Sequence, residues 1–252
     1  MTGLSLTTQT FDEWLISRLR VAGAYGGTMD GVHGREVIAA LERFQGAYDL
    51  PITGRADQAT IDALRKVQSK NPNSNLVTYE KVPVLAEPVW MREARRYIGL
   101  KEIPGPKSNG TIMGWAEKFG GWIAGFYTDD DIPWCGLFVG SMISNTLPKE
   151  PLLANPLGAL NWKKFGVESR VARGAILVFE RKGGGHVGFY VGEDRTHYHV
   201  LGGNQDNSVS ITRVDKSRLV SAGVRWPKTA NAPIAGKVEL SSTGAPVAKS
   251  EA

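Results

Sequence analysis

The sequence contains one cysteine, Cys135, among 252 residues. A single thiol cannot form an internal disulfide, and it excludes zinc sites that need two or more thiolates. The sequence also lacks an apolar run near the roughly 20 residues that a membrane-spanning helix needs. Its cleanest apolar run, residues 175–179, has the length of a strand. We predict no membrane insertion, no metal and no cofactor.

Two further features are missing. The first residues, MTGLSLTTQTFDEW, lack a basic segment followed by an apolar core, so no secretory signal is predicted. No Lys/Arg cluster is interleaved with aromatic residues, so nucleic acid is not an expected partner.

The net charge of +5 lies in residues 76–252, because residues 1–75 hold eight acidic and eight basic side chains. A mildly basic body suits a polyanionic partner, including a cell-wall polymer.

Residues 11–67 show helical periodicity in three segments separated by glycine-bearing turns at residues 26–34 and 50–55. The apolar positions that set this period are Phe11, Leu15, Ile16 and Leu19, then Val37, Ile38, Leu41 and Phe44, then Ile61, Leu64 and Val67. Asp57 is placed to cap the third helix. The pattern predicts a small three-helix module over residues 1–70.

This stretch resembles the peptidoglycan-binding domain type 1, a three-helix family. The resemblance rests on a DG-x-x-G turn at Asp30, Gly31 and Gly34, an A-x-x-x-FQ helix at residues 40–45, and the turn DLPITG at residues 49–54. It implies binding of cell-wall glycan or stem peptide, with Asp30, Gly31 and Gly34 as the wall-binding positions. From the residues alone, these positions are equally well explained as residues that form turns and the core.

Composition divides the rest of the chain. Residues 71–87 carry Pro, Asn and Ser with little periodicity and are predicted to be a linker, and residues 228–252 are predicted to be a flexible tail. Between them, residues 88–227 form the second predicted domain. Helices are expected at 90–98, at 111–119 and from Cys135 onward, and strands at 175–179, 186–191, 198–201 and 209–214. Helices followed by strands indicate an α+β fold.

Three positions in this domain could perform nucleophilic catalysis. Cys135 follows Pro133 and Trp134 at a predicted helix start, where the helix dipole favours an anion and can lower a thiol pKa. His186 lies on a strand whose apolar neighbours should face the core, which leaves the imidazole on the other side as a general base. Asn204, or its neighbour Gln205, could hold the imidazole in one tautomer. Each residue alone has an ordinary structural explanation.

The order Cys, His, Asn resembles the NlpC/P60 and CHAP superfamily of papain-like cysteine hydrolases. The similarity covers the segments IPWCGLFV, GAILVF, GHVGFYVGE and VLGGNQ. It implies a papain-like domain with helices packed on an antiparallel sheet, and cleavage of peptidoglycan amides by Cys135, His186 and Asn204. Gln205 is the alternative third member. Many CHAP members carry Glu where this sequence has Gly202, which puts a carboxylate-assisted imidazole in doubt.

Substrate contacts are predicted at residues near the nucleophile, namely Trp134, Tyr127, Asp130 and Asp131. The acidic run at 129–131 could bind a calcium ion, but its spacing is not that of an EF-hand, and a substrate-facing loop is favoured. His197 and His199 share one strand face, as a two-histidine metal site would. No third ligand is apparent, so ordinary surface residues are predicted.

Together these patterns predict a monomeric cysteine hydrolase that binds peptidoglycan and cleaves its stem-peptide amides. The modular layout resembles a bacteriophage endolysin that is made in the host cytoplasm and acts at the cell wall after release. The alternatives are a non-catalytic wall-binding or virion protein and a secreted antibacterial effector of the same fold. The scissile bond, an amidase or an endopeptidase target, is left open.

Overall fold

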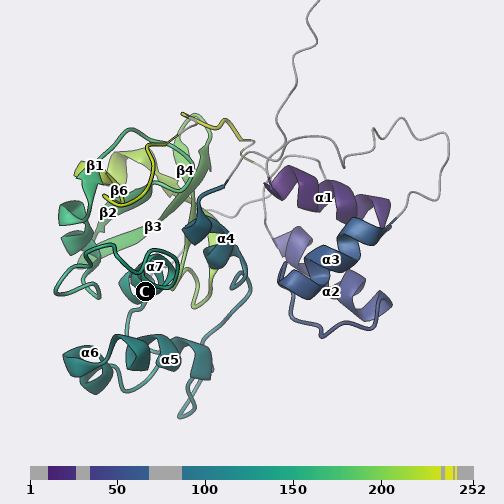
Figure 1. Cartoon of the computed structure of the whole chain (residues 1–252), viewed down its shortest axis with the longest axis horizontal. Helices are drawn as coiled ribbons and strands as arrows, with labels where there is room; N and C mark the ends of the chain where they lie inside the picture. The colour runs from purple at the N-terminus through teal and green to yellow at the C-terminus, as the bar shows by residue number, and fades with distance from the viewer. Residues whose placement is uncertain (1–10, 27–34, 68–86, 234–235, 241, 243–252) are drawn as a thin grey trace, which may run out of the picture.

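A computed structural model of the chain describes residues 11–26, 35–67, 87–233, 236–240 and 242 (Figure 1). We call residues 11–67 the helical unit and the residues from 87 onward the mixed unit. Each unit has its own cluster of buried apolar side chains. The mixed unit packs helices on an antiparallel sheet, so the predicted α+β class is confirmed. Among the described residues, no helix has the length and apolar character to cross a bilayer.

The helical unit consists of α1 (Phe11–Val21), α2 (Arg35–Ala47) and α3 (Gln58–Lys66). The Asp57 carboxylate accepts a hydrogen bond from the Thr60 N–H at 2.9 Å, which confirms the predicted cap. Gln45 is fully buried, and its Oε1 accepts from the N–H groups of Thr53 and Gly54, both at 2.9 Å. This glutamine therefore holds the turn before α3 against α2. The predicted wall-binding residues Asp30, Gly31 and Gly34 lie outside the described residues.

The α-helices of the mixed unit are α4 (Val89–Arg95), α5 (Gly110–Phe119), α6 (Gly121–Phe126) and α7 (Cys135–Thr146), followed by the 3-10 helix η2 (Ala159–Lys164). The helix expected to reach residue 98 ends at Arg95, and the chain turns at Gly99, whose φ of 92° favours glycine. The short α6 was not predicted. The α7 helix begins at Cys135, as predicted, and the Phe138 ring packs against Phe189 in the sheet.

The sheet has six strands in the order β1-β6-β2-β3-β4-β5. Their bounds are β1 Val167–Glu168, β2 Ile176–Arg181, β3 Gly184–Glu193, β4 His197–Gly202, β5 Ser210–Asp215 and β6 Leu219–Trp226, with the 3-10 helix η3 (Lys216–Arg218) before β6. All four predicted strands are present within a few residues of their expected bounds. The β6 strand, which pairs with β2, was not predicted from the sequence, because residues 221–222 in its middle are exposed and do not follow an apolar pattern. The β3 strand lies between β2 and β4 and is buried on both faces from His186 onward.

The segment predicted as a tail packs on the mixed unit where it is described. The Leu240 N–H donates to Glu193 O at 2.9 Å, and the Glu193 N–H donates to Val238 O at 2.8 Å. Near its start, the N–H groups of Lys228 and Thr229 donate to the buried carboxylate of Glu150 at 2.9 and 2.7 Å. The described residues 228–229 and 236–240 thus differ from the flexible tail that their composition predicted, because β3 and Glu150 supply partners for their backbone groups.

A buried ion cluster joins the two units. Arg95 of α4 contacts Asp12 of α1 at 2.7 Å and Glu87 at 2.7 Å, and all three side chains are almost inaccessible. Burial by itself lowers the pKa of Arg95, but the carboxylates of Asp12 and Glu87 outweigh it and the pKa is raised. The α4 helix lies between the helical unit and α7, which places this cluster at the contact between units (Figure 1).

Candidate functional site

Cys135 is the first residue of α7 and lies beside the strand that carries His186. The backbone N–H groups of Val187, Gly136 and Cys135 itself face its sulfur. Because Val187 directly follows His186 in β3, the thiol lies against the backbone next to the imidazole. The tertiary structure therefore places the Cys135 sulfur at the backbone of the residue that follows His186, although the two predicted catalytic residues are 51 positions apart (186 − 135) in the chain.

The thiol is less accessible and less acidic than the sequence predicted. Only 4% of Cys135 is exposed. Burial raises the pKa of the thiol above its ordinary value, although the surrounding N–H groups and the positive charge of Arg181 act in the opposite direction. The loop after α7 covers the helix start so closely that a Cβ on Gly136 would lie 2.2 Å from Pro156 O. Burial therefore favours the protonated thiol over the thiolate that the position at the helix start predicted.

His186 is fully buried, not on an open strand face. Its ring stacks on Phe179 of β2, with centroids 6.4 Å apart and planes 22° apart. Its Nε2 lies 3.1 Å from Gln205 Oε1. The alternation of side chains along β3 does place His186 on the opposite face of the strand from its apolar neighbours. That face is also covered, by Phe179 of β2 and by Gln205 in the loop after β4.

Gln205, not Asn204, contacts the imidazole, and its own orientation is set by further bonds. Gln205 Nε2 donates to Ser210 O at 2.6 Å, which turns Oε1 toward His186. Thr212 Oγ1 donates to the same Oε1 at 2.9 Å. An amide oxygen only accepts, so Nε2 of the neutral imidazole carries the proton and Nδ1 is the basic nitrogen. Thr212 lies on β5 opposite Val200 of β4 and was not predicted.

Asn204 supports the helix start instead. With its amide oriented to satisfy both neighbours, it accepts from the Trp134 backbone N–H at 3.1 Å and donates to Glu102 Oε1 at 3.3 Å. The Trp134 indole N–H donates to the same Glu102 oxygen at 2.6 Å. Asn204 adopts a φ of 56°, a left-handed conformation that asparagine tolerates. It therefore holds the residue before Cys135 in place without touching the imidazole.

Gly202 leaves the space that Gln205 occupies beside this histidine. A Cβ at this position would lie 3.0 Å from Gln205 Oε1 and 3.1 Å from His186 Nε2. A longer side chain has no room while Gln205 occupies its present place. A neutral amide, supplied from three residues further along the chain, therefore contacts the imidazole.

Three of the four predicted substrate residues are buried. Trp134 and Tyr127 belong to the apolar cluster of the mixed unit, so they do not form walls of an open groove. Asp130 accepts hydrogen bonds from the N–H groups of Ile103 and Asn109, at 3.0 and 2.7 Å, and so holds that loop. Only Asp131 is exposed.

Two exposed aromatic rings lie on α6 instead. Trp122 and Phe126 are 51% and 56% exposed, and their ring centroids are 6.3 Å apart. Sequence position alone did not distinguish these rings from the buried Trp115, Tyr127 and Trp134.

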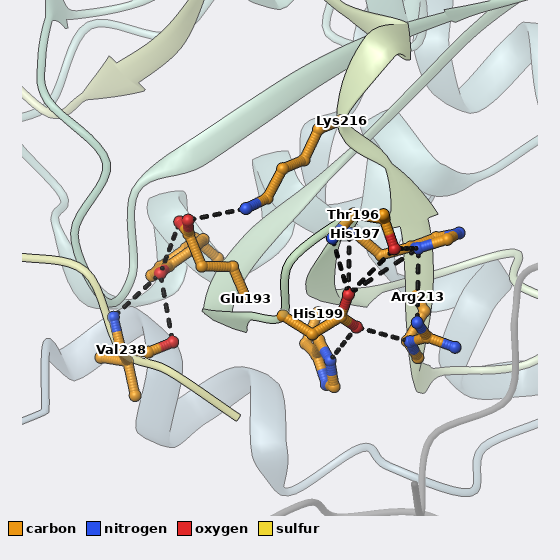
Figure 2. Close-up of polar contacts among 9 residues, drawn as sticks. Glu193, Thr196, His197, His199, Arg213, Lys216 and Val238 are labelled. Carbon is orange, nitrogen blue, oxygen red and sulfur yellow. Dashed lines mark hydrogen bonds and ion pairs between the residues drawn. The ribbon is translucent and has the colours of Figure 1, made fainter. Parts of the chain in front are cut away.

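His197 and His199 belong to a second polar cluster, shown in Figure 2. His199 is fully buried, contrary to the surface position predicted for it, and its Nε2 lies 3.0 Å from Asp194 Oδ2. The same oxygen accepts from Arg213 Nε at 2.7 Å (Figure 2). Burial alone would raise the pKa of Asp194, but Arg213 and neighbouring donors lower it. The guanidinium takes the place that a cation would need, and no metal-binding group is found among the described residues.

The adjacent residue Glu193 fastens the C-terminal segment. Its carboxylate contacts Lys216 Nζ at 2.8 Å and accepts from the Tyr190 hydroxyl at 3.0 Å. The Val238 N–H donates to the same hydroxyl at 3.0 Å, which joins residues 236–240 to this cluster (Figure 2). The charged pair of residues 193 and 194 therefore has a structural role that is distinct from the site at Cys135.

Comparison with known proteins identifies part of the chain. Residues 13–64 match the family described as "Putative peptidoglycan binding domain". The match covers about a fifth of the chain and falls on α1, α2 and α3. The chain therefore carries a peptidoglycan-binding domain, and peptidoglycan is the partner that this domain indicates.

A curated relative was also found. The chain is 40% identical over 60 residues to "Putative OxPP cycle protein OpcA" of Synechococcus elongatus. The alignment covers 24% of this chain and 14% of the relative, so the chain spans about a seventh of the relative's length. No solved structure matches the chain.

Proposed function

We propose that the protein is a cysteine hydrolase that cleaves an amide bond of the peptidoglycan stem peptide. One observation carries the proposal. His186 is held by Gln205 with its basic nitrogen defined, and the Cys135 sulfur lies at the N–H of the next residue, Val187. The peptidoglycan-binding domain supports the choice of substrate, and the resemblance to papain-like hydrolases supports the reaction.

In the proposed reaction, His186 Nδ1 takes the proton of the Cys135 thiol as the sulfur attacks the amide carbonyl carbon. The imidazolium then protonates the leaving amine, and the acyl-enzyme forms as the C–N bond breaks. Water, deprotonated by the same nitrogen, releases the acid and restores the thiol. Backbone N–H groups at the start of α7 are placed to stabilise the oxyanion, and losing one such donor typically costs about 10²–10³ in rate.

The raised pKa of the thiol sets a requirement on this mechanism. A buried thiol gives little thiolate at neutral pH, so attack and proton transfer must be coupled. Gln205 stabilises the imidazolium because its Oε1 accepts a hydrogen bond from the Nε2–H group, and an amide oxygen does not remove that proton. The proposal also requires a path by which substrate passes the loop that lies against Gly136.

The setting that fits the proposed activity is lysis of a bacterial host by a bacteriophage, with the enzyme acting at the cell wall after release from the cytoplasm. An antibacterial effector of the same fold would perform the same chemistry.

The deciding experiment compares wild type with Cys135→Ala on purified sacculi. We expect both proteins to sediment with sacculi, and only wild type to release soluble muropeptides, which mass spectrometry assigns to an amidase or an endopeptidase cut. Glu168→Gln, an exposed change on β1 at the edge of the sheet, is the control. Muropeptide release by Cys135→Ala at the wild-type rate would refute the cysteine mechanism.

Deleting the helical unit is a poor substitute for this test. The deletion removes Asp12 and leaves Arg95 of α4 with one of its two carboxylate partners. Breaking a buried ion pair from one side typically costs about 3–5 kcal/mol. A loss of activity would then report on stability as much as on wall binding.

A second function is favoured by one observation, the covered thiol. A protein whose Cys135 is 4% exposed could bind the wall without turnover. Wild type that sediments with sacculi but releases no muropeptide would support this alternative.

A further inference from the structure

An open groove of about 730 Å³ lies on the helical unit. Its described lining residues come from the turn after α2 and from one face of α3, and they are Tyr48, Leu50, Ala59, Asp62, Ala63, Lys66 and Val67. Positions 59, 62, 63 and 66 repeat with the spacing of a single helix face. Most of this lining falls within residues 13–64, the part of the chain that matches the peptidoglycan-binding family. The partner that this domain indicates therefore has an open surface to bind.

The aromatic wall of the groove is supported from behind. The Tyr48 ring stacks on the buried ring of Phe44, with centroids 4.3 Å apart and planes 28° apart. Tyr48 is still 45% exposed, so the ring face opposite Phe44 is open to the groove. The turn that carries the ring is fixed as well, because the Leu50 N–H donates to Gln45 O at 2.9 Å. A rigid ring with one open face is a preorganised contact for the apolar face of a ligand.

The α3 wall offers small side chains and a backbone that is already paired. Ala59 and Ala63 line the groove with single methyl groups, so a flat ligand can approach the helix closely. Along α3 the N–H and C=O groups bond to one another. At its end Arg18 takes orphan carbonyls, since its guanidinium donates to Leu64 O at 2.9 Å and to Val67 O. An extended peptide, which binds through main-chain hydrogen bonds, is therefore poorly matched to this wall.

The charges on the described lining of the groove also argue against a peptide. Asp62 Oδ1 accepts from Gln58 Nε2 at 2.9 Å and pairs with Arg65 at 3.1 Å, so this carboxylate already has partners. Lys66 is the other charged residue of that lining. One lysine does not complement a stem peptide, which carries several carboxylates and an amine. The groove is instead suited to an uncharged ligand with flat apolar faces.

We propose that the groove between Tyr48 and α3 binds the glycan strand of peptidoglycan, with the C–H face of an N-acetylhexosamine ring stacked on Tyr48. A pyranose ring has an apolar C–H face and polar groups around its edge, and N-acetylglucosamine carries no charge. The family match indicates peptidoglycan as the partner, and the groove selects the sugar part of that polymer. This site uses residues other than Asp30, Gly31 and Gly34, and it does not depend on hydrolysis at Cys135.

The test titrates chitotetraose, an uncharged chain of N-acetylglucosamine units, into the full chain by calorimetry. We expect Tyr48→Ala to weaken binding about tenfold or more, which is the usual scale for truncating a central aromatic contact. Trp122→Ala is the matched control, because it removes a similarly exposed aromatic ring from α6, and it should bind like the parent. Circular dichroism checks that each variant is folded.

A second variant blocks the groove without removing any contact. Ala59 is exposed, so Ala59→Leu adds bulk to the α3 wall and leaves the core of the helical unit unchanged. We expect this variant also to weaken binding of chitotetraose about tenfold. It keeps the test decisive if Tyr48→Ala does not fold.

Two further measurements separate a sugar from a stem peptide. Lys66→Glu should change the affinity for chitotetraose by less than about threefold, and added salt should have little effect, because the ligand is uncharged. The synthetic pentapeptide L-Ala–D-Glu–meso-diaminopimelate–D-Ala–D-Ala should not compete with chitotetraose. Competition by this peptide would assign the groove to the stem peptide and overturn the glycan assignment.

The remaining outcomes are equally decisive. Equal affinity of the parent, Tyr48→Ala and Ala59→Leu for chitotetraose, or no binding to the parent, would overturn the groove. A loss in Trp122→Ala alone would move the sugar contact to α6 and overturn it as well. Hydrolysis of sacculi is measured in parallel: cleavage without chitotetraose binding overturns the groove and leaves the hydrolase intact, whereas binding without cleavage supports the groove and overturns the hydrolase.

Discussion

Two buried histidines on neighbouring strands show how different partners give the same side chain different roles. His186 on β3 has a neutral amide at 3.1 Å and a thiol beside the following residue. His199 on β4 has a carboxylate at 3.0 Å, and that carboxylate also contacts Arg213 at 2.7 Å. In the proposed mechanism the first histidine accepts and returns a proton, whereas the second is one member of a cluster of charged side chains (Figure 2). Burial alone does not distinguish a catalytic from a structural histidine.

The largest expected effect separates the two histidines by activity. His186→Ala should lower muropeptide release by about 10³-fold or more, because the buried thiol loses its base. His199→Ala should keep activity within about threefold once the folded fraction is taken into account, because it is outside the proposed site. The measurement is the initial rate of muropeptide release. Equal losses for both variants would remove the distinction between the clusters.

The next effect separates the clusters by stability. Asp194→Asn should lower the free energy of unfolding by about 2–3 kcal/mol, because it leaves the Arg213 guanidinium with no carboxylate in a largely buried place. Urea unfolding followed by circular dichroism measures this change. Asp215→Asn is the control, because its carboxylate caps a surface turn. If both variants unfold at the same urea concentration, the Asp194 cluster does not stabilise the fold.

A smaller effect tests the amide partner of His186. Gln205→Leu should reduce kcat by about 10–10²-fold, because the ring loses the acceptor that defines its tautomer. Asn204→Leu, at the adjacent position, should act mainly through stability and leave the pH profile of kcat unchanged. A shifted pH profile in Asn204→Leu with none in Gln205→Leu would exchange the roles of the two residues.

The smallest effect is a dependence of stability on pH. Burial lowers the pKa of His199, although Asp194 acts in the opposite direction. Below about pH 6.5 the unfolded chain therefore binds a proton that the folded chain resists, and the free energy of unfolding falls by about 1 kcal/mol toward pH 5.5. The lowered pKa of Asp194 adds a further loss only below about pH 4, as the unfolded carboxyl binds its proton first.

His199→Gln supplies the comparison for this slope. Urea midpoints of wild type and His199→Gln at pH 7 and 5.5 should show the flatter dependence in the variant. Identical slopes in the two proteins would mean that His199 does not resist protonation.

Local patterns located most of the secondary structure. The helix that starts at Cys135 and the cap at Asp57 follow from residues close together in the chain, where period and capping chemistry act. The interior of β6 was missed because residues 221–222 are exposed, and the polar surface of an antiparallel strand resembles a loop. Residues 236–240 differ from the prediction for a related reason: their composition is that of a loop, but Glu193 and Tyr190 supply bonds for their backbone.

The candidate site was only partly predictable. Alternation along β3 and the glycine turn before it singled out His186, but nothing local decided between Asn204 and Gln205, which are neighbours in one turn. That decision depends on Ser210 and Thr212 of β5, which orient the glutamine. The pKa of the thiol was predicted in the wrong direction because the helix start is a local feature, whereas the loop at Pro156 that covers it is not.

The sequence by itself determined the α+β composition, the three-helix peptidoglycan-binding domain and the identity of the one possible thiol nucleophile, because these depend on short-range periodicity and on residue counts. Tertiary structure alone decided which amide holds His186, how deeply Cys135 is covered, and that Arg95 joins two units across 83 positions of chain (95 − 12). Those properties arise from the removal of water around buried groups and from contacts between distant segments. Both exist only once the segments are packed together.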